Sequence, residues 1–221
     1  SWVIEHEVMD GGPNEARAWE ALSALLARSW EHESGQRIGI ARAAVDTGFE
    51  ASAVYTWARS QSPGQVMPVK GAEGFNRSSP VAGPTYVDVR TDGKRLRRGA
   101  RLWTVATSTF KVEFYRHLRL ARPTREALEA GEGYPEGSVH LPAWIDTEWL
   151  KQAVAEQLVT VRNKRGFAKL EWQKLRERNE ALDCRVYARA AAWVAGVDRW
   201  SDEQWQAALE TGRPVVTPKP K

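Results

Sequence analysis

The pattern of hydrophobic and polar residues changes several times along the N-terminal third of the chain. Residues 2–9 alternate, which predicts a strand, and apolar residues at helical spacing predict a helix over residues 15–30. Residues 38–45 form a short apolar run with little alternation, which is typical of a buried strand. Residues 51–59 then predict a helix, and residues 65–69 predict another strand. The order strand, helix, strand, helix, strand is typical of an α/β fold.

The rest of the chain predicts two hairpins among helices. Thr91-Asp92-Gly93 joins two strand-like runs, and the basic segment Asn163-Lys164-Arg165-Gly166 joins two more. Apolar residues at helical spacing predict a strongly amphipathic helix over residues 179–194. The other predicted elements are a strand at 100–106, a helix at 109–118, a strand at 138–141, a helix at 146–157 and a helix at 201–209.

The composition fits one domain, or one domain with a large insertion, because the chain has 221 residues and 42% of them are hydrophobic. The formal net charge of +4 and the pI of about 9.3 permit a polyanionic partner without requiring one. The single cysteine, Cys184, excludes an internal disulfide and fits a reducing compartment. No apolar run approaches the roughly 20 residues that cross a bilayer, and the N-terminus does not look like a signal peptide. We therefore expect a cytoplasmic protein with no membrane partner.

Asp46 is the first residue with a candidate chemical role. It ends the apolar run at residues 38–45, so we expect it at the carboxyl end of a buried strand. Gly48 and a predicted helix follow it, so the same aspartate could instead be a helix N-cap. The local sequence leaves both interpretations open.

Glu180 and Asp183 are the second candidates, at the start of the 179–194 helix. They are three residues apart, so their carboxylates share one helix face near its positive end, where acids often do no more than compensate the helix dipole. Asp183 also precedes Val186 of the apolar stripe by three residues, so we expect it to face inward. An inward-facing carboxylate needs a partner or a cation. Together with Asp46 it could bind a hard cation such as Mg²⁺ or Mn²⁺.

Two basic stretches could bind DNA phosphates, although each could equally be a solvated hairpin. The first is residues 94–98 with Arg101. The second lies around the predicted turn at 163–166 and ends just before the helix that carries Asp183. A basic hairpin beside a carboxylate cluster is what a nuclease needs to hold a DNA backbone. The cations of the second stretch are Arg162, Lys164, Arg165, Lys169 and Lys174.

Several other motifs are absent from these 221 residues. There is no G-x-x-x-x-G-K-[ST] segment, so no P-loop ATPase is encoded here. One cysteine and four scattered histidines cannot form a Cys/His zinc cluster. There is also no G-x-S-x-G elbow of the kind that carries a nucleophilic serine.

The segment at residues 179–188, Asn-Glu-Ala-Leu-Asp-Cys-Arg-Val-Tyr-Ala, resembles the C-terminal signature of the large terminase subunits of lambda-type phages, the GpA family. Other segments resemble successive stretches of that family in the same order. They are residues 2–9, 43–48, 69–71, 98–103 and 139–142. The resemblance covers nearly the whole chain up to about Trp193.

The resemblance implies an α/β fold of the RNase H-like type, in which helices flank a mixed sheet. This nuclease domain would cover residues 1–196, with loop and hairpin insertions at 71–175, and a short helix and flexible tail would follow at 197–221. The chain begins at what looks like the third strand of the family fold. The first two strands, and the first catalytic aspartate, are therefore not in this sequence. Ser108 also stands where the family often has an aspartate.

The activity that the resemblance implies is endonuclease cleavage of concatemeric double-stranded DNA, with Mg²⁺ or Mn²⁺ at a two-metal site. Asp46 and Asp183 would be the catalytic metal ligands, with Glu180 as a close alternative to Asp183. The expected DNA contacts are Lys164, Arg165, Lys169, Lys174 and Lys111. The expected partners are the terminase ATPase domain, the small terminase subunit and the portal protein of the procapsid, in the host cell cytoplasm.

Two other functions stay open on the sequence. The absence of the first strand suits a DNA-gripping or docking module of the packaging motor that does not cleave DNA in this form. A related RNase H-like resolvase or recombination nuclease is the third hypothesis, and it would prefer four-way junctions to linear DNA.

Overall fold

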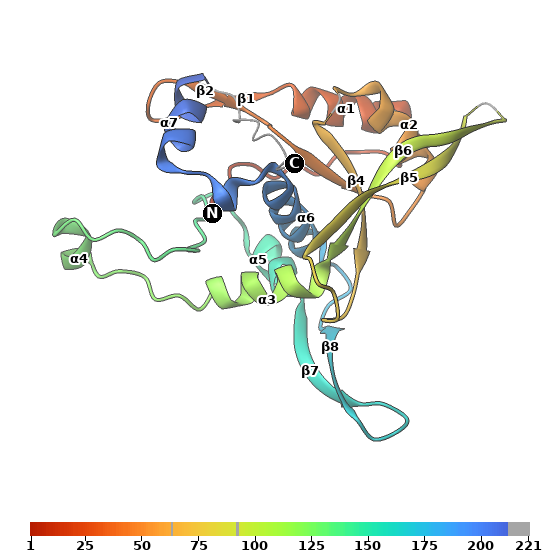
Figure 1. Cartoon of the computed structure of the whole chain (residues 1–221). Coiled ribbons are helices and arrows are strands. Elements are labelled where there is room, and N and C mark those ends of the chain that lie inside the picture. The colour runs from red at the N-terminus through yellow and green to blue at the C-terminus, as the bar shows by residue number, and fades with distance from the viewer. Residues whose placement is uncertain (63, 92, 212–221) are drawn as a thin grey trace. The chain divides into compact units, whose positions relative to one another are not determined.

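The computed structural model describes residues 1–62, 64–91 and 93–211, and the chain folds into two compact units (Figure 1). Each unit is built from segments that are far apart in the sequence. Unit 1 consists of Ser1–Val8, Glu73–Arg77 and Thr107–Val186. Unit 2 consists of Met9–Ala72, Ser78–Ala106 and the segment that begins at Tyr187.

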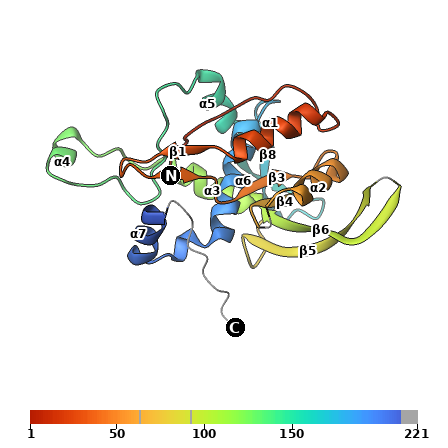
Figure 2. The same ribbon diagram turned by 90° about the horizontal axis from the view of Figure 1, so that it is seen from above.

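Unit 2 contains a four-stranded mixed sheet with the strand order β3-β4-β6-β5. Its strands are β3 (Ala43–Asp46), β4 (Val66–Ala72), β5 (Val81–Thr91) and β6 (Lys94–Ala106). β3, β4 and β6 are parallel, whereas β5 runs antiparallel to β6 and forms a long hairpin with it (Figures 1 and 2). The predicted α/β architecture with a mixed sheet is therefore confirmed, and Asp46 is the last residue of its strand.

Two helices, α1 (Ala16–Leu26) and α2 (Ala51–Ser60), form the core of unit 2 together with the sheet. Trp57 of α2 is buried with Val66 of β4, and α2 also contacts β5 and β6. Trp19 of α1 stacks on Trp57, with ring centroids 5.1 Å apart. Both helices were predicted from apolar residues at helical spacing, and these apolar residues are the ones that pack in the core of unit 2.

Replacing Trp57 by alanine is expected to lower the free energy of unfolding by about 3–5 kcal/mol. Trp57 is 7% exposed, stacks on Trp19, and donates a hydrogen bond from its indole Nε1 to Ser23 Oγ at 2.9 Å. Its truncation leaves a cavity and removes this hydrogen bond. Urea unfolding followed by circular dichroism measures the loss. The matched control is Trp144→Ala, since Trp144 is 53% exposed. Equal losses in the two variants would contradict the core assignment.

Smaller elements complete unit 2. β1 (Ser29–Glu31) and β2 (Arg37–Gly39) pair antiparallel as a separate two-stranded sheet. The long helix α6 (Glu180–Ala195) begins in unit 1 and ends in unit 2, where Gly196 follows it with a φ of 88°. A glycine in this left-handed conformation is a common way for a helix to end. The 3-10 helix η1 (Val197–Arg199) and α7 (Asp202–Thr211) come next.

Unit 1 consists of short helices, one hairpin and the first turns of α6. Asp146 caps α5, because its Oδ1 accepts the backbone N–H of Trp149 at 2.7 Å. The predicted hairpin with the basic tip is also confirmed. The elements are α3 (Thr107–His117), α4 (Arg125–Glu129), α5 (Thr147–Ala153), β7 (Glu156–Arg162) and β8 (Ala168–Lys174). Buried side chains of this unit include Phe110, Phe114, Trp149, Leu182 and Val186.

Two predicted strands are wrong. Residues 2–9 and 138–141 pair with each other only in an isolated parallel bridge between Trp2 and His140, whose rings stack with centroids 3.8 Å apart. Trp2 is 74% exposed and Ile4 is exposed as well. The alternation in the first segment therefore does not mark a buried face of a sheet.

The predicted order of elements in the N-terminal third also needs correction. The apolar run at 38–45 is divided, because β2 ends at Gly39 and β3 begins at Ala43. The helix predicted at 15–30 is shorter, since residues 29–31 pair with β2 as the strand β1. The observed order is a helix, a two-stranded sheet, a strand, a helix and a strand.

The helix predicted over 146–157 ends at Ala153, and Glu156 already begins β7. Asp92 of the predicted turn and residues 212–221 of the predicted tail lie outside the described residues. Within the part of the chain that the structure describes, no helix has both the length and the apolar character needed to cross a membrane.

Candidate active site

A cluster of buried polar residues in unit 1 is joined by hydrogen bonds. Lys111 Nζ lies 2.6 Å from Glu156 Oε2, in an ion pair whose side chains are 7% and 4% exposed. Asn179 Nδ2 donates to Glu156 Oε1 at 3.0 Å and to Asp183 Oδ2 at 3.1 Å. The Lys174 ammonium group donates to Asn179 Oδ1 at 3.0 Å. Asn179 thus connects the buried ion pair with the carboxylate of Asp183.

Backbone and side-chain contacts fix the position of Glu156 at the start of β7. The Tyr115 hydroxyl on α3 donates to the backbone carbonyl of Glu156, and the N–H of Leu175 donates to the carbonyl of Ala155 at 2.7 Å. Lys111 lies four residues before Tyr115, so one face of α3 supplies both contacts to Glu156. Burial, with the charge of Glu156, raises the pKa of the Tyr115 hydroxyl, which therefore remains a protonated donor at neutral pH.

Asp183 and Glu180 occupy different environments although both lie in the first turn of α6. Asp183 is half-buried and bonded to Asn179, as expected for an inward-facing acid. Glu180 is exposed, and its Oε2 lies 3.4 Å from Arg178 Nε in a surface ion pair. The helix dipole favours a negative charge at either position. Only Asp183, however, is joined to the buried cluster by Asn179.

Asp46 lies at the exposed end of β3 in unit 2. Its Oδ1 accepts a hydrogen bond from the Tyr187 hydroxyl at 3.2 Å. A Cβ atom added at Gly48 would lie 2.8 Å from Asp46 Oδ2, so the glycine leaves room for this carboxylate. Asp46 does not cap α2, because that helix begins at Ala51 and has Glu50 as its N-cap residue. The N-cap interpretation of Asp46 is therefore wrong.

Helix α6 carries both Asp183 and the hydrogen-bond partner of Asp46. Tyr187 follows Asp183 by four residues, a spacing that places two residues on one helix face. Carboxylate oxygens are the ligands that Mg²⁺ and Mn²⁺ prefer, so the donor type of both aspartates fits such a cation. Among the described residues, however, no three His, Cys, Asp or Glu side chains form a group that could hold a metal ion.

The hairpin formed by β7 and β8 carries exposed cations at its tip and along β8. Lys164 and Arg165 lie in the turn, which Asn163 orders by accepting the backbone N–H groups of Arg165 at 2.9 Å and Phe167 at 3.0 Å. Lys169 lies near the start of β8 and is exposed. These charges face solvent on an ordered turn, where the phosphates of a nucleic acid can reach them.

Lys111 differs from the other expected DNA contacts. It is buried, and its ammonium group is paired with the carboxylate of Glu156. A phosphate in solvent cannot reach this nitrogen in the observed arrangement, so the structure does not support the expected DNA contact of Lys111. Lys174, in contrast, is exposed while it donates to Asn179.

Comparison with known proteins places these features in a family. The family model described as the endonuclease domain of the terminase large subunit gpA matches residues 1–205. The chain belongs to this family. It is 29% identical over 222 residues to the terminase large subunit of Enterobacteria phage P21, and the aligned region covers 100% of this chain and 32% of that protein. It is 27% identical over 201 residues to the terminase large subunit of Escherichia phage lambda, and the aligned region covers 90% of this chain and 29% of that protein. The chain thus spans about a third of the length of these relatives, and no solved structure matches it significantly.

Sequence reasoning missed two residues of this terminase endonuclease domain, Glu156 and Tyr115. Nothing in the sequence around Glu156 indicates that it is buried, and its ion-pair partner lies 45 residues earlier. The role of Asn179 as a connecting residue was also missed, although it is part of the family signature. Its spacing of four residues from Asp183 was an available signal, because residues at this spacing on a helix can bond to each other.

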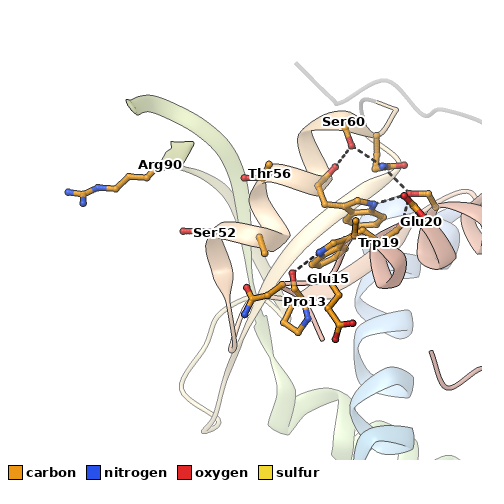
Figure 3. Close-up of a pocket in the computed structure, with 14 residues that line it drawn as sticks. Pro13, Glu15, Trp19, Glu20, Ser52, Thr56, Ser60 and Arg90 are labelled. Carbon is orange, nitrogen blue, oxygen red and sulfur yellow. Dashed lines mark hydrogen bonds between the residues drawn. The ribbon is translucent and has the colours of Figure 1, made fainter. Parts of the chain in front are cut away.

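A broad hollow of about 890 Å³ lies between α1 and α2 of the terminase domain (Figure 3). Trp19 Nε1 donates to the Pro13 carbonyl at 2.7 Å, and Trp57 Nε1 donates to Ser23 Oγ at 2.9 Å. Arg90 lines the rim and points away from these groups (Figure 3). The Trp19 indole therefore bonds to the segment before α1, and the Trp57 indole joins α2 to α1, so we assign this hollow to helix packing.

Proposed function

We propose that this chain is the metal-dependent endonuclease domain of a viral terminase large subunit, and that it cuts concatemeric double-stranded DNA during genome packaging. The family match over residues 1–205 carries the proposal. Two acids at typical metal-ligand positions support it: Asp46 ends a parallel strand, and Asp183 lies in the first turn of a late helix.

We also propose an RNase H-like fold for the nuclease domain. The mixed sheet of unit 2, with three parallel strands and one antiparallel strand, supports this assignment. So does the position of Asp46 at the carboxyl end of β3, because ligands of open α/β sheets bind outside the carboxyl ends of the strands.

Asp46 and Asp183 are the proposed ligands of Mg²⁺ or Mn²⁺, with Glu180 as an alternative to Asp183. When bound, a pair of such ions activates a water molecule and stabilises the leaving oxygen in phosphodiester hydrolysis. The contribution of the chain is to orient the carboxylates. Asn179 donates to Asp183 and Tyr187 donates to Asp46. Such supporting hydrogen bonds fix the direction of a ligand carboxylate.

Lys164, Arg165, Lys169 and Lys174 are proposed to hold the DNA backbone. The first three are exposed on the β7–β8 hairpin, and Lys174 also bonds to Asn179, which connects the DNA contact with the acid cluster. The further proposed partners are the terminase ATPase domain, the small terminase subunit and the portal protein, in the cytoplasm of the host cell.

The 221-residue chain is expected to convert supercoiled plasmid DNA into nicked and linear forms in the presence of Mn²⁺. Removal of the metal with EDTA should abolish this conversion, because the aspartates alone supply no activated water. Agarose gels measure both reactions, and re-addition of Mn²⁺ is the control. Cleavage that continues at full rate in EDTA would contradict a metal-dependent mechanism.

The alternative is a DNA-gripping or docking module that does not cleave DNA in this form. It is favoured by the lack, within the described residues, of a group of three acids that could hold a metal ion. Binding of the same plasmid in Mn²⁺ without any cleavage would support this alternative over the nuclease.

A further inference from the structure

A second basic site lies in unit 2, in a pocket of about 330 Å³ that includes residues of the first basic stretch and is separate from the acid cluster and the β7–β8 hairpin. It is lined by the end of α2, by β4 and by the hairpin of β5 and β6. Arg59, Arg98 and Arg101 contribute three positive charges, and Tyr86 contributes an aromatic ring. None of the described residues that line the pocket is acidic. A concave surface with this excess of positive charge suits an anion.

The hairpin fixes Arg98 at this pocket by an unusual backbone conformation. The φ of Arg98 is 52°, a left-handed value that non-glycine residues rarely adopt because it strains the backbone. Asp88 Oδ1 accepts the backbone N–H of Arg98 at 2.9 Å and so holds the conformation. The guanidinium group of Arg98 then lies 5.3 Å from the centroid of the Tyr86 ring, which is itself 58% exposed.

Asp88 neutralises a different arginine of the hairpin. Its Oδ2 accepts two hydrogen bonds from the Arg95 guanidinium, at 2.8 and 2.6 Å. Only the backbone of Arg98 is bonded to Asp88, so the charge of the Arg98 side chain is left for another partner. Within the described residues no acid pairs with Arg59, Arg98 or Arg101. The pocket therefore keeps its positive charge.

A fourth arginine, Arg42, adds to the positive electrostatic potential around Arg101. Arg42 precedes β3, and its Nε is buried without a hydrogen-bond partner among the described residues. Burial, together with the positive charge of Arg101, lowers the pKa of the Arg42 guanidinium. The charge of Arg101 thus acts on Arg42, and no acid in the described part of the chain offsets the two. A buried donor without a partner is costly unless a ligand or water satisfies it.

We propose that this arginine pocket binds a phosphate of the DNA backbone and is a second anchoring site besides the β7–β8 hairpin. Guanidinium groups bind phosphate oxygens through paired, charge-assisted hydrogen bonds. A polymer rather than a free anion is indicated because Lys94 and Arg97, both exposed on the same hairpin, extend the positive charge beyond the pocket. The proposal rests on the proposed function only for the identity of the anion.

The test compares two double variants that remove the same charge. Arg98→Gln with Arg101→Gln removes two cations from the pocket, whereas Arg119→Gln with Arg122→Gln removes two exposed cations that lie outside the pocket and outside both basic hairpins. Binding of a fluorescein-labelled 20-base-pair duplex to the 221-residue chain is measured by anisotropy, in EDTA so that no cleavage occurs. The pocket variant is expected to bind at least about tenfold more weakly than the control variant. The slope of its log affinity for the duplex against log salt concentration should also become shallower, by the amount that corresponds to about one phosphate contact.

Equal affinities of the two variants would overturn the proposal. A second result would also overturn it. If inorganic phosphate raises the midpoint of thermal unfolding of the parent chain but not of the pocket variant, and the two variants bind the duplex equally, the ligand of the pocket is a free anion. Circular dichroism of both variants controls for folding. A parent chain that fails to cut plasmid in Mn²⁺ but still binds the duplex through this pocket would count against the nuclease and not against the pocket.

Discussion

Asp183→Asn is expected to reduce Mn²⁺-dependent plasmid cleavage by roughly 10²–10³-fold, the effect of losing one well-placed electrostatic group. Asparagine has the shape of aspartate and keeps an oxygen that can accept the hydrogen bond from Asn179, now made to Asp183 at 3.1 Å. The fold should therefore be retained. What the variant removes is the negative charge that a divalent cation requires.

Two further variants sharpen this experiment. Glu177→Gln removes an exposed charge just before α6 and is the matched control, with cleavage at the parent rate. Glu180→Gln separates the two candidate ligands of the helix. Glu180 is exposed and paired with Arg178, so we expect only a modest loss. Parent-level cleavage by Asp183→Asn, together with loss of cleavage in Glu180→Gln, would transfer the proposed ligand role to Glu180.

The sequence predicted best those elements whose signal is local. The amphipathic helix over 179–194 is observed as Glu180–Ala195, because its apolar stripe is the face that is buried. Both predicted hairpins are present as well. The strand predicted at 2–9 failed because alternation does not supply a pairing partner, and among the described residues its strand pairing is limited to the bridge between Trp2 and His140.

The candidate site shows the same limit more sharply. Asp46 was predicted at the end of a strand from neighbouring residues, and it is there. Its hydrogen-bond partner Tyr187 is 141 residues away in the sequence, and no local pattern could have indicated that contact. The burial of Glu156 at the start of β7 likewise depends on Lys111 of helix α3. Contacts between distant segments, which determine whether a charge is buried or exposed, are set by the fold rather than by local spacing.

Lys111→Met is expected to lower the free energy of unfolding by about 3–5 kcal/mol, because it leaves the carboxylate of Glu156 buried without its counter-charge. Both side chains of the pair are almost fully buried, so solvent cannot replace the lost ammonium group. Urea unfolding measures the loss. The matched control is Lys169→Met, since Lys169 forms only an exposed pair with Glu171 at 3.4 Å. That change should cost less than about 1 kcal/mol.

The double variant Lys111→Met with Glu156→Gln tests whether the effect comes from the unpaired charge. Glutamine keeps an oxygen for the hydrogen bond from Asn179 but carries no charge, so the double variant should be more stable than Lys111→Met alone. Urea unfolding of Lys111→Met, together with its affinity for the DNA duplex, decides between two roles for Lys111. If Lys111 contacts DNA, its substitution lowers the affinity of the chain for the duplex and leaves the free energy of unfolding unchanged. If Lys111 supports the acid cluster, its substitution lowers the free energy of unfolding, and the hydrogen bonds that orient Asn179 and Asp183 are weakened as well.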